Sequence, residues 1–183
     1  NPEWIAADLL SQAEHDPLAQ SILITDDDAW ASRVEDAVQR QMTLLATAPT
    51  VAQAWKDYGA IVLAPLGRAA AIVNQIAPEH VELAVADPDA IANAVRHAGA
   101  IFLGRFAPEA LGDYVTGSNH VLPTSGAARF ASGLSVLDFM KRTSIQRITE
   151  QGFRHLAQAA ETLAKAEGLP AHGLSVSIRR GQG

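Results

Sequence analysis

Short apolar segments that alternate with helical segments limit the fold of this chain more than any other feature. Two of them are nearly the same: residues 59–63 read Gly-Ala-Ile-Val-Leu and residues 99–103 read Gly-Ala-Ile-Phe-Leu. In each, the glycine suits a helix end and the apolar run suits a buried strand. Further strands are predicted at 21–25, 81–85 and 143–148. The alternation predicts an α/β fold, with an open, largely parallel sheet that is Rossmann-like but incomplete and is flanked by helices.

Helix signals fill the segments between these strands. The predicted helices are 2–14 with Asn1 as cap, 26–45, one capped by Thr50 that ends at Gly59, 67–76, one opened by Asp87 and Pro88, one opened by Pro108, 150–167, and one from Pro170. The three aspartates at 26–28 could suggest a cation site. At a helix start they more often cap the helix and complement its dipole, and we interpret them in that way.

The pattern predicts two parts of the chain. Residues 1–133 form the α/β domain, and residues 134–183 form a mostly helical C-terminal arm. The arm carries an apolar row at helical spacing that includes Phe153, Leu156 and Leu163. This row could pack on the sheet of its own chain or on a partner chain, and we expect the arm to form a dimer.

Composition excludes several classes of function. The 183 residues are 48% hydrophobic and 19% charged, with a net charge of −6, which is an ordinary globular balance. The acidic balance, with no basic run longer than Arg179 and Arg180, argues against a nucleic-acid partner. No apolar run approaches the ~20 residues of a membrane span, and no signal peptide opens the chain, so we expect a cytoplasmic protein without a membrane partner. Without cysteine, a metal would need His, Asp, Glu or amide oxygen ligands.

A carboxyl group and an imidazole are adjacent in the sequence Ala-Pro-Glu-His at 77–80. Pro78 favours a turn, on which Glu79 and His80 can converge. Both side chains can accept and pass protons near neutral pH. The pair could also be an ordinary solvated loop, because adjacent Glu and His residues are common.

A second set of residues could bind a metal. Gln12 and His15 are three residues apart, so they project from one side of the first helix. Together with Asp113 and His172 they could supply the nitrogen and oxygen ligands of a zinc site. Their spacing in the sequence does not by itself bring the four side chains together.

A polar loop at 116–126 contains His120 and is rich in hydrogen-bond donors, which suits contact with a ligand. Neither a Gly-x-Gly-x-x-Gly turn nor a Walker-type phosphate loop occurs in the sequence. We therefore expect no nucleotide site within these 183 residues.

Seven motifs along the chain resemble the C-terminal part of the histidinol dehydrogenases. In the order of that family they lie at 10–16, 77–80, 99–104, 112–115, 119–124, 130–136 and 167–172. They run from end to end of the chain, and several are long and polar. The N-terminal half of the family, with its NAD-binding domain, has no counterpart here, and the chain begins at Asn1 and not at Met. The resemblance thus implies a fragment that we expect to be inactive alone.

The resemblance also implies a function. Enzymes of this family are zinc-containing homodimers that oxidise L-histidinol to L-histidine in two NAD-dependent steps through the aldehyde, the last steps of histidine biosynthesis. The implied zinc ligands are Gln12, His15, Asp113 and His172, and the implied proton-transfer pair is Glu79 and His80. The implied substrate contacts are Gln12, His15, His80, Asp113, His120, Glu167 and His172. The tail that carries the last two would reach into the site of the partner subunit.

Two other functions remain open at this point. The chain could be a zinc-binding dimerisation module without catalysis, in which case it would hold metal but turn over no substrate. It could also be a metal-dependent hydrolase that uses Glu79 as a base, since zinc beside a carboxylate suits hydrolysis as well. Assays for NAD turnover and for ester or amide cleavage distinguish the dehydrogenase, the dimerisation module and the hydrolase.

Overall fold

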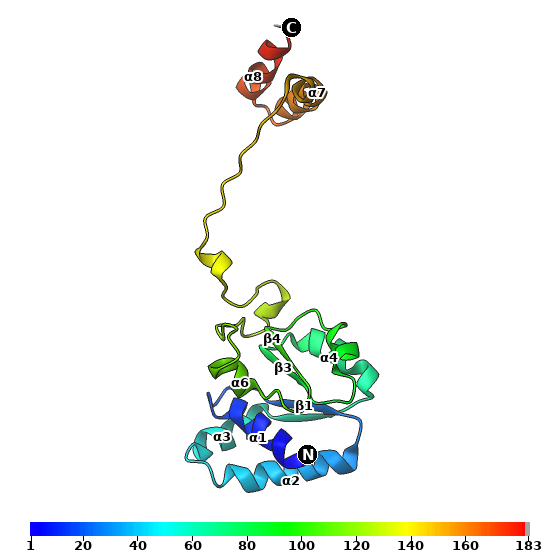
Figure 1. Ribbon diagram of the computed structural model, residues 1–183, viewed down its shortest axis with the longest axis vertical. Coiled ribbons are helices and arrows are strands. Elements are labelled where there is room, and N and C mark those ends of the chain that lie inside the picture. Colours follow the sequence, from blue (N-terminus) through cyan, green and yellow to red (C-terminus); the bar gives the residue numbers. More distant parts are fainter. Residues whose placement is uncertain (182–183) are drawn as a thin grey trace. The chain divides into compact units, whose positions relative to one another are not determined.

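The computed structural model describes residues 1–181, which form two compact units. The first unit, Asn1–Phe139, contains α1 (Pro2–Ala13), β1 (Ile22–Thr25), α2 (Asp28–Met42), α3 (Ala48–Tyr58), β2 (Ala60–Leu63), α4 (Ala69–Ile76), β3 (His80–Leu83), α5 (Pro88–Ala92), β4 (Ala100–Leu103) and α6 (Glu109–Tyr114) (Figure 1). Short 3-10 turns occur at Leu66–Arg68, Ala127–Arg129 and Val136–Phe139. The second unit begins at Met140 and contains α7 (Glu150–Ala166) and α8 (Pro170–Arg180).

The strands of the first unit pair in two parallel ladders. β1 pairs with β2, and β3 pairs with β4 so that His80 lies opposite Ala100. The α/β class with short parallel strands and flanking helices is confirmed, although the described strands form two ladders of two. The expectation that β2 and β4 are buried is wrong, because Leu63 is 54% and Leu103 is 44% exposed. Each of these strands has a single neighbour in its ladder, which leaves an edge uncovered.

The predicted caps at helix N-termini are confirmed with one exception, whereas the helix end predicted at Gly99 is wrong, because α5 already ends at Ala92. The Asp27 carboxylate accepts a hydrogen bond from the Trp30 N–H at 2.8 Å, which confirms capping by the aspartate run. The predicted cap at Thr50 is wrong, because α3 already begins at Ala48. Pro49 stands in the first turn, where its missing N–H costs nothing, so the helix starts ahead of Thr50.

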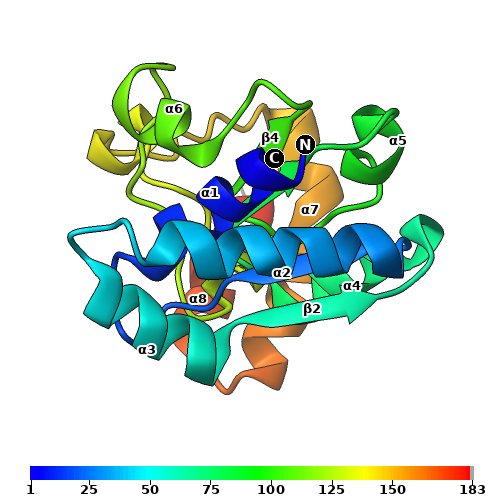
Figure 2. The same ribbon diagram turned by 90° about the horizontal axis from the view of Figure 1, so that it is seen from below.

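Two apolar clusters hold the first unit together. The larger one packs α1 against α2 and α3 (Figure 2), with Val34, Val38 and Val51 fully buried. Burial of such a side chain contributes about 1.5–3 kcal/mol. The smaller cluster joins α4 and β3 through Val73 and Val81. The larger cluster fixes α1, whose last turn carries Gln12.

In the second unit, α7 packs against α8. The Thr149 hydroxyl accepts a hydrogen bond from the Gly152 N–H at 3.1 Å, which confirms the predicted start of α7. Between the two helices, Gly168 adopts φ +71°, a conformation that glycine adopts readily. On α7, Leu156 and Leu163 are 57% and 63% exposed, so the apolar row of the arm is open to solvent or to another surface.

The strand predicted at 143–148 is wrong. These residues are exposed and have no assigned strand. A strand needs a hydrogen-bonded neighbour, and an apolar alternation alone does not supply one. None of the helices within residues 1–181 is both long enough and apolar enough to cross a membrane.

Candidate metal and proton-transfer site

Three elements of the first unit bring polar side chains to one place. Gln12 lies on the last turn of α1, and His15 follows two residues after the helix ends. The N–H of His15 donates to the carbonyl of Gln12 at 3.3 Å, which holds the chain in a turn there. His80 opens β3, and Asp113 lies on α6.

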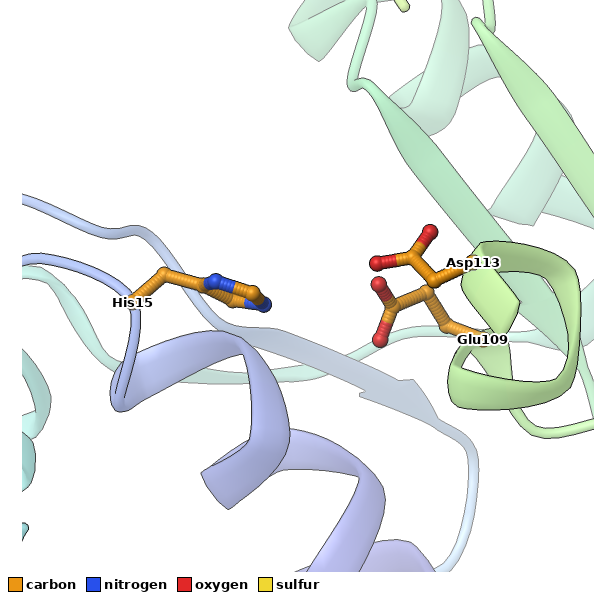
Figure 3. A group of neighbouring side chains, drawn as sticks. All are labelled: His15, Glu109 and Asp113. Atoms are coloured by element: carbon orange, nitrogen blue, oxygen red, sulfur yellow. The ribbon is translucent and has the colours of Figure 1, made fainter. Parts of the chain in front are cut away.

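An imidazole and two carboxyl groups face each other across this site. His15 points from the end of α1 toward Glu109 and Asp113 on α6 (Figure 3). One ligand atom from each of the three lies within 4.8 Å of the others. Glu109 and Asp113 are four residues apart on a helix, so their side chains project from the same side. His15 is exposed, Asp113 is half-buried and Glu109 is only 3% exposed.

His80 lies between the amide of Gln12 and the carboxyl group of Glu109. Its Nδ1 is 3.2 Å from Oε1 of Gln12, and its Nε2 is 3.9 Å from Oε1 of Glu109. Three buried atoms here, Gln12 Nε2, His80 Nε2 and Glu109 Oε1, have no hydrogen-bond partner of good geometry in the described chain. Buried polar groups are normally paired, so this arrangement suits a polar ligand that would complete their bonds.

The surroundings shift the proton affinities of the acid and the imidazole. Burial raises the pKa of Glu79, the nearby charge of Asp113 raises it further, and His15 offsets part of the rise. Burial lowers the pKa of His80, although Asp113 acts in the opposite direction. Burial, followed by the neighbouring Asp113, raises the pKa of Glu109 to about 7. The neutral imidazole of His80 and the adjacent carboxyl group of Glu79, whose pKa is raised, are therefore both suited to accept protons.

A strained turn presents the Glu79–His80 pair. Ala77 ends α4 in the left-handed region at φ 53°, and its N–H donates to the carbonyl of Val73 at 2.8 Å. The carbonyl of Glu79 then accepts the N–H of Ala100 at 2.8 Å, which ties the turn to β4. Non-glycine residues adopt positive φ rarely, and such strain concentrates at functional sites.

The structure therefore brings five of the residues singled out by the sequence to one place: Gln12, His15, Glu79, His80 and Asp113. His120 is exposed in the loop after α6. Glu167 and His172 belong to the second unit, where both line a shallow hollow between α7 and α8 together with Ala160, Leu163, Ala164, Ala171, Ser175 and Val176.

Sequence reasoning did not identify Glu109. A signal was present, because Glu109 follows Pro108 at a helix start and precedes Asp113 by one helical turn. An acidic residue in the first turn of a helix is common, however, and usually only complements the helix dipole. What distinguishes Glu109 from an ordinary acid at a helix start is that it is buried and lies beside His80 of β3, and neither property can be seen in the local sequence.

The side chains present fit a zinc ion. Zinc binds imidazole nitrogen and carboxylate or amide oxygen, with four ligands in most structural sites. His15, Glu109 and Asp113 supply three such donors within 4.8 Å of one another, and the amide oxygen of Gln12 lies 3.2 Å from Nδ1 of the neighbouring His80. Buried donors and acceptors without partners lie directly beside them.

Comparison with known proteins identifies the family. The family model for histidinol dehydrogenase matches residues 1–180. The chain is 62% identical over 179 residues to the histidinol dehydrogenase of Caulobacter vibrioides and 59% identical over 180 residues to that of Rhizobium meliloti. Each alignment covers 98% of this chain and 42% of the relative.

A solved structure agrees with these matches. The crystal structure of histidinol dehydrogenase from Elizabethkingia anophelis superposes with a TM-score of 0.91 at 40% sequence identity, covering 99% of this chain and 42% of that one. The chain thus spans about two fifths of the length of the relatives that it matches. With residues 1–180 matched by the family model and 98% of the chain aligned to a relative at 62% identity, the chain belongs to the histidinol dehydrogenase family.

Proposed function

We propose that this chain supplies the zinc-binding and proton-transfer part of an enzyme that oxidises L-histidinol to L-histidine. One observation carries the proposal. In a chain of the histidinol dehydrogenase family, the Gln12 amide and the His15 and Asp113 side chains gather beside His80 and Glu79. The substrate carries an imidazole and an amine, which are groups that a zinc site and a set of carboxylates would bind.

The zinc ligands in this proposal are Gln12, His15, Asp113 and His172. Bound zinc would supply a positive charge that orients the substrate through its nitrogen atoms. This set is the one that the resemblance implies, and Glu109, which lies with His15 and Asp113 and has its Oε1 3.9 Å from Nε2 of His80, stands beside it.

Glu79 and His80 move the protons. His80, whose pKa burial lowers, is neutral near pH 7 and can take the proton of the substrate hydroxyl group. The aldehyde must gain a water molecule before it can be oxidised, and Glu79, whose pKa burial raises, is suited to activate that water. Each group contributes typically about 10²–10⁴ to the rate of the step it assists.

The C-terminal arm completes the site in a homodimer. We propose that His172 and Glu167, which line one hollow of the arm, serve the site of the partner subunit. The exposed apolar residues of α7, Leu156 and Leu163, would then be covered by the partner. His120 would contact the substrate from the loop after α6.

The hydride acceptor binds elsewhere in this proposal. Two oxidations require an acceptor, and we propose NAD, bound by residues outside these 183. The sequence has neither a Gly-x-Gly-x-x-Gly turn nor a Walker-type phosphate loop. The chain alone would then be inactive. As a biosynthetic enzyme it would work in the cytoplasm without a nucleic-acid or membrane partner.

The test compares two proteins. The first is the chain alone, and the second is the extended protein, in which the chain is joined to the N-terminal portion of the Caulobacter vibrioides relative that it does not match. Each receives zinc, histidinol and NAD, and NADH is followed by its absorbance. We expect turnover only by the extended protein, with the same protein carrying His80→Asn as the matched control.

Each result decides one part of the proposal. Turnover by the chain alone within about tenfold of the extended protein would overturn the placement of the NAD site. An extended protein that binds zinc and dimerises but does not oxidise histidinol would instead be a dimerisation module. Cleavage of esters or amides by either protein would identify a hydrolase.

A further inference from the structure

A second row of acidic side chains lies behind the candidate site, on the same elements. Asp8 precedes Gln12 by one helical turn on α1, so the two share a face. Glu82 follows His80 by two residues on β3, so these two point to the same side of the strand. The burial pattern of β3 agrees with this orientation, because Val81 and Leu83, which point to the other side of the strand, are both buried.

Glu82 connects this row to α6. Its Oε1 accepts a hydrogen bond from the backbone N–H of Glu109 at 2.7 Å. Pro108, in the N-cap position of α6, provides no side-chain cap, and the first N–H groups of any helix lack partners within that helix. Glu82 therefore caps α6 from a different element, and this bond sets where Glu109 and Asp113 lie.

Glu82 also connects to α1. Its carboxyl group interacts with that of Asp8, and a hydrogen bond between the two raises the pKa of Glu82 and lowers that of Asp8. Two carboxyl groups can form such a bond only if one of them carries a proton. Burial raises the pKa of both groups. For Glu82, the hydrogen bond from the Glu109 N–H lowers the pKa and the nearby Asp8 and Glu109 carboxyl groups raise it, so that it lies at about 7.

We propose that Glu82 is a positioning residue, which shares a proton with Asp8 and caps α6, and thereby fixes the spacing of α1, β3 and α6 at the zinc and proton-transfer site. This inference rests on the proposed function. A carboxyl group that bonds on both sides holds Gln12, His80 and Asp113 in one arrangement although they come from separate elements. Residues that orient metal ligands in this way typically affect metal affinity by about 10–100-fold.

Two substitutions in the extended protein test the role. Glu82→Gln keeps both bonds, because its oxygen accepts the Glu109 N–H and its amide N–H₂ donates to Asp8, as the protonated carboxyl group does. Glu82→Leu removes both bonds. We expect Glu82→Leu to weaken zinc binding about 10–100-fold, and Glu82→Gln to stay within about threefold of the unmodified protein, measured by competition with a chelator. Glu35→Leu, at an exposed acid on α2, is the control for the loss of one carboxylate and should change little.

A spectroscopic measurement tests the shared proton without relying on Glu82→Leu to fold. Infrared difference spectra of the metal-free protein near pH 6 should show, besides a band from Glu109, the carbonyl band of a protonated carboxyl group that is lost in both Glu82→Gln and Asp8→Asn. The band should persist in Glu14→Gln. A band unchanged by both substitutions would overturn the shared proton, and a Glu82→Gln protein as impaired as Glu82→Leu would overturn the positioning role. If the unmodified protein binds no zinc, the proposed function fails while the infrared result still decides the carboxyl pair.

Discussion

Nε2 of His80 lies 3.9 Å from Oε1 of Glu109, and within residues 1–181 neither atom has a hydrogen-bond partner of good geometry. A proton accepted by His80 would therefore form an imidazolium directly beside a buried carboxyl group. Glu109→Gln keeps the shape of the side chain and removes the possible charge. We expect the extended protein with this substitution to retain zinc and to lose about 10–100-fold in turnover, measured by NADH formation and metal content.

The zinc content of this variant is decisive for the role of Glu109. Loss of zinc together with activity would make Glu109 a ligand, in agreement with its distance to His15 and Asp113. Unchanged turnover would show that His80 needs no partner at Nε2. Glu161→Gln on α7, an acid that pairs with Arg180, is a control for the removal of one carboxylate elsewhere.

His80→Asn should lower turnover of the extended protein by about 10²–10⁴ and leave zinc and substrate binding nearly intact. Glu79→Gln should slow chiefly the oxidation of the aldehyde, which needs an activated water. Rapid mixing with histidinol and, separately, with the aldehyde measures the two steps. Near-normal turnover of the His80→Asn protein at its pH optimum would remove His80 from proton transfer.

Stability of the first unit should depend on the proton of Glu82. Its pKa is raised from 4.5 to about 7 on folding, so the folded protein binds more protons than the unfolded chain between these values. The stabilisation from this proton is fully present below 4.5 and is lost as the pH rises through about 7. Urea unfolding measures this dependence. Between about pH 5 and pH 8, the free energy of unfolding should fall less in the Glu82→Gln protein than in the unmodified chain. His80, which contributes with the opposite sign, and Asp8, Glu79 and Glu109, which contribute with the same sign, are present in both proteins, so the comparison isolates Glu82 together with its effect on these groups. If the free energy of unfolding depended on pH equally in both proteins, the raised pKa of Glu82 would be contradicted.

Ala77 should tolerate glycine and resist valine. Its φ of 53° favours glycine, whereas its buried methyl group favours alanine, so we expect Ala77→Gly to change the unfolding free energy by less than about 1 kcal/mol. Ala77→Val adds a β-branched side chain in this conformation and should destabilise by about 2–4 kcal/mol. Ala37→Val, equally buried but on α2 with ordinary helical backbone, is the control for crowding alone. Equal losses at both sites would show that strain at Ala77 is unimportant.

Subunits with complementary defects should restore each other if the arm serves the partner. We expect the extended protein with His15→Ala, and separately that with His172→Ala, to lose zinc and activity. Mixed and reassembled, the two would form heterodimers with one intact site each, so about a quarter of all sites should recover. Turnover and bound zinc are both measured, and both should recover to about a quarter of the value of the unmodified dimer. No recovery in demonstrated heterodimers would mean that His172 serves its own subunit.

Local signals in the sequence were enough for much of the fold. Asp27 caps α2 because the carboxylate and the N–H groups it satisfies are neighbours in the chain. The sequence alone likewise placed Gln12 on the last turn of α1 and predicted an α/β fold, whereas His15 lies after the end of that helix and not on it. The motifs that resemble histidinol dehydrogenases also identified the family, because such motifs are a property of the sequence and need no coordinates.

Only the tertiary structure decided how these local pieces meet. Residues 143–148 have the pattern of a strand but no neighbour to pair with, and the four strands of the first unit separate into two ladders. His80 meets Gln12 across 68 positions of sequence. Glu109 became a site residue only because folding brings His15 and His80, which are distant in the sequence, next to its carboxyl group. The physical reason is that caps and helix faces depend on residues within a few positions of each other, whereas strand pairing, burial and the convergence of side chains depend on packing between distant segments.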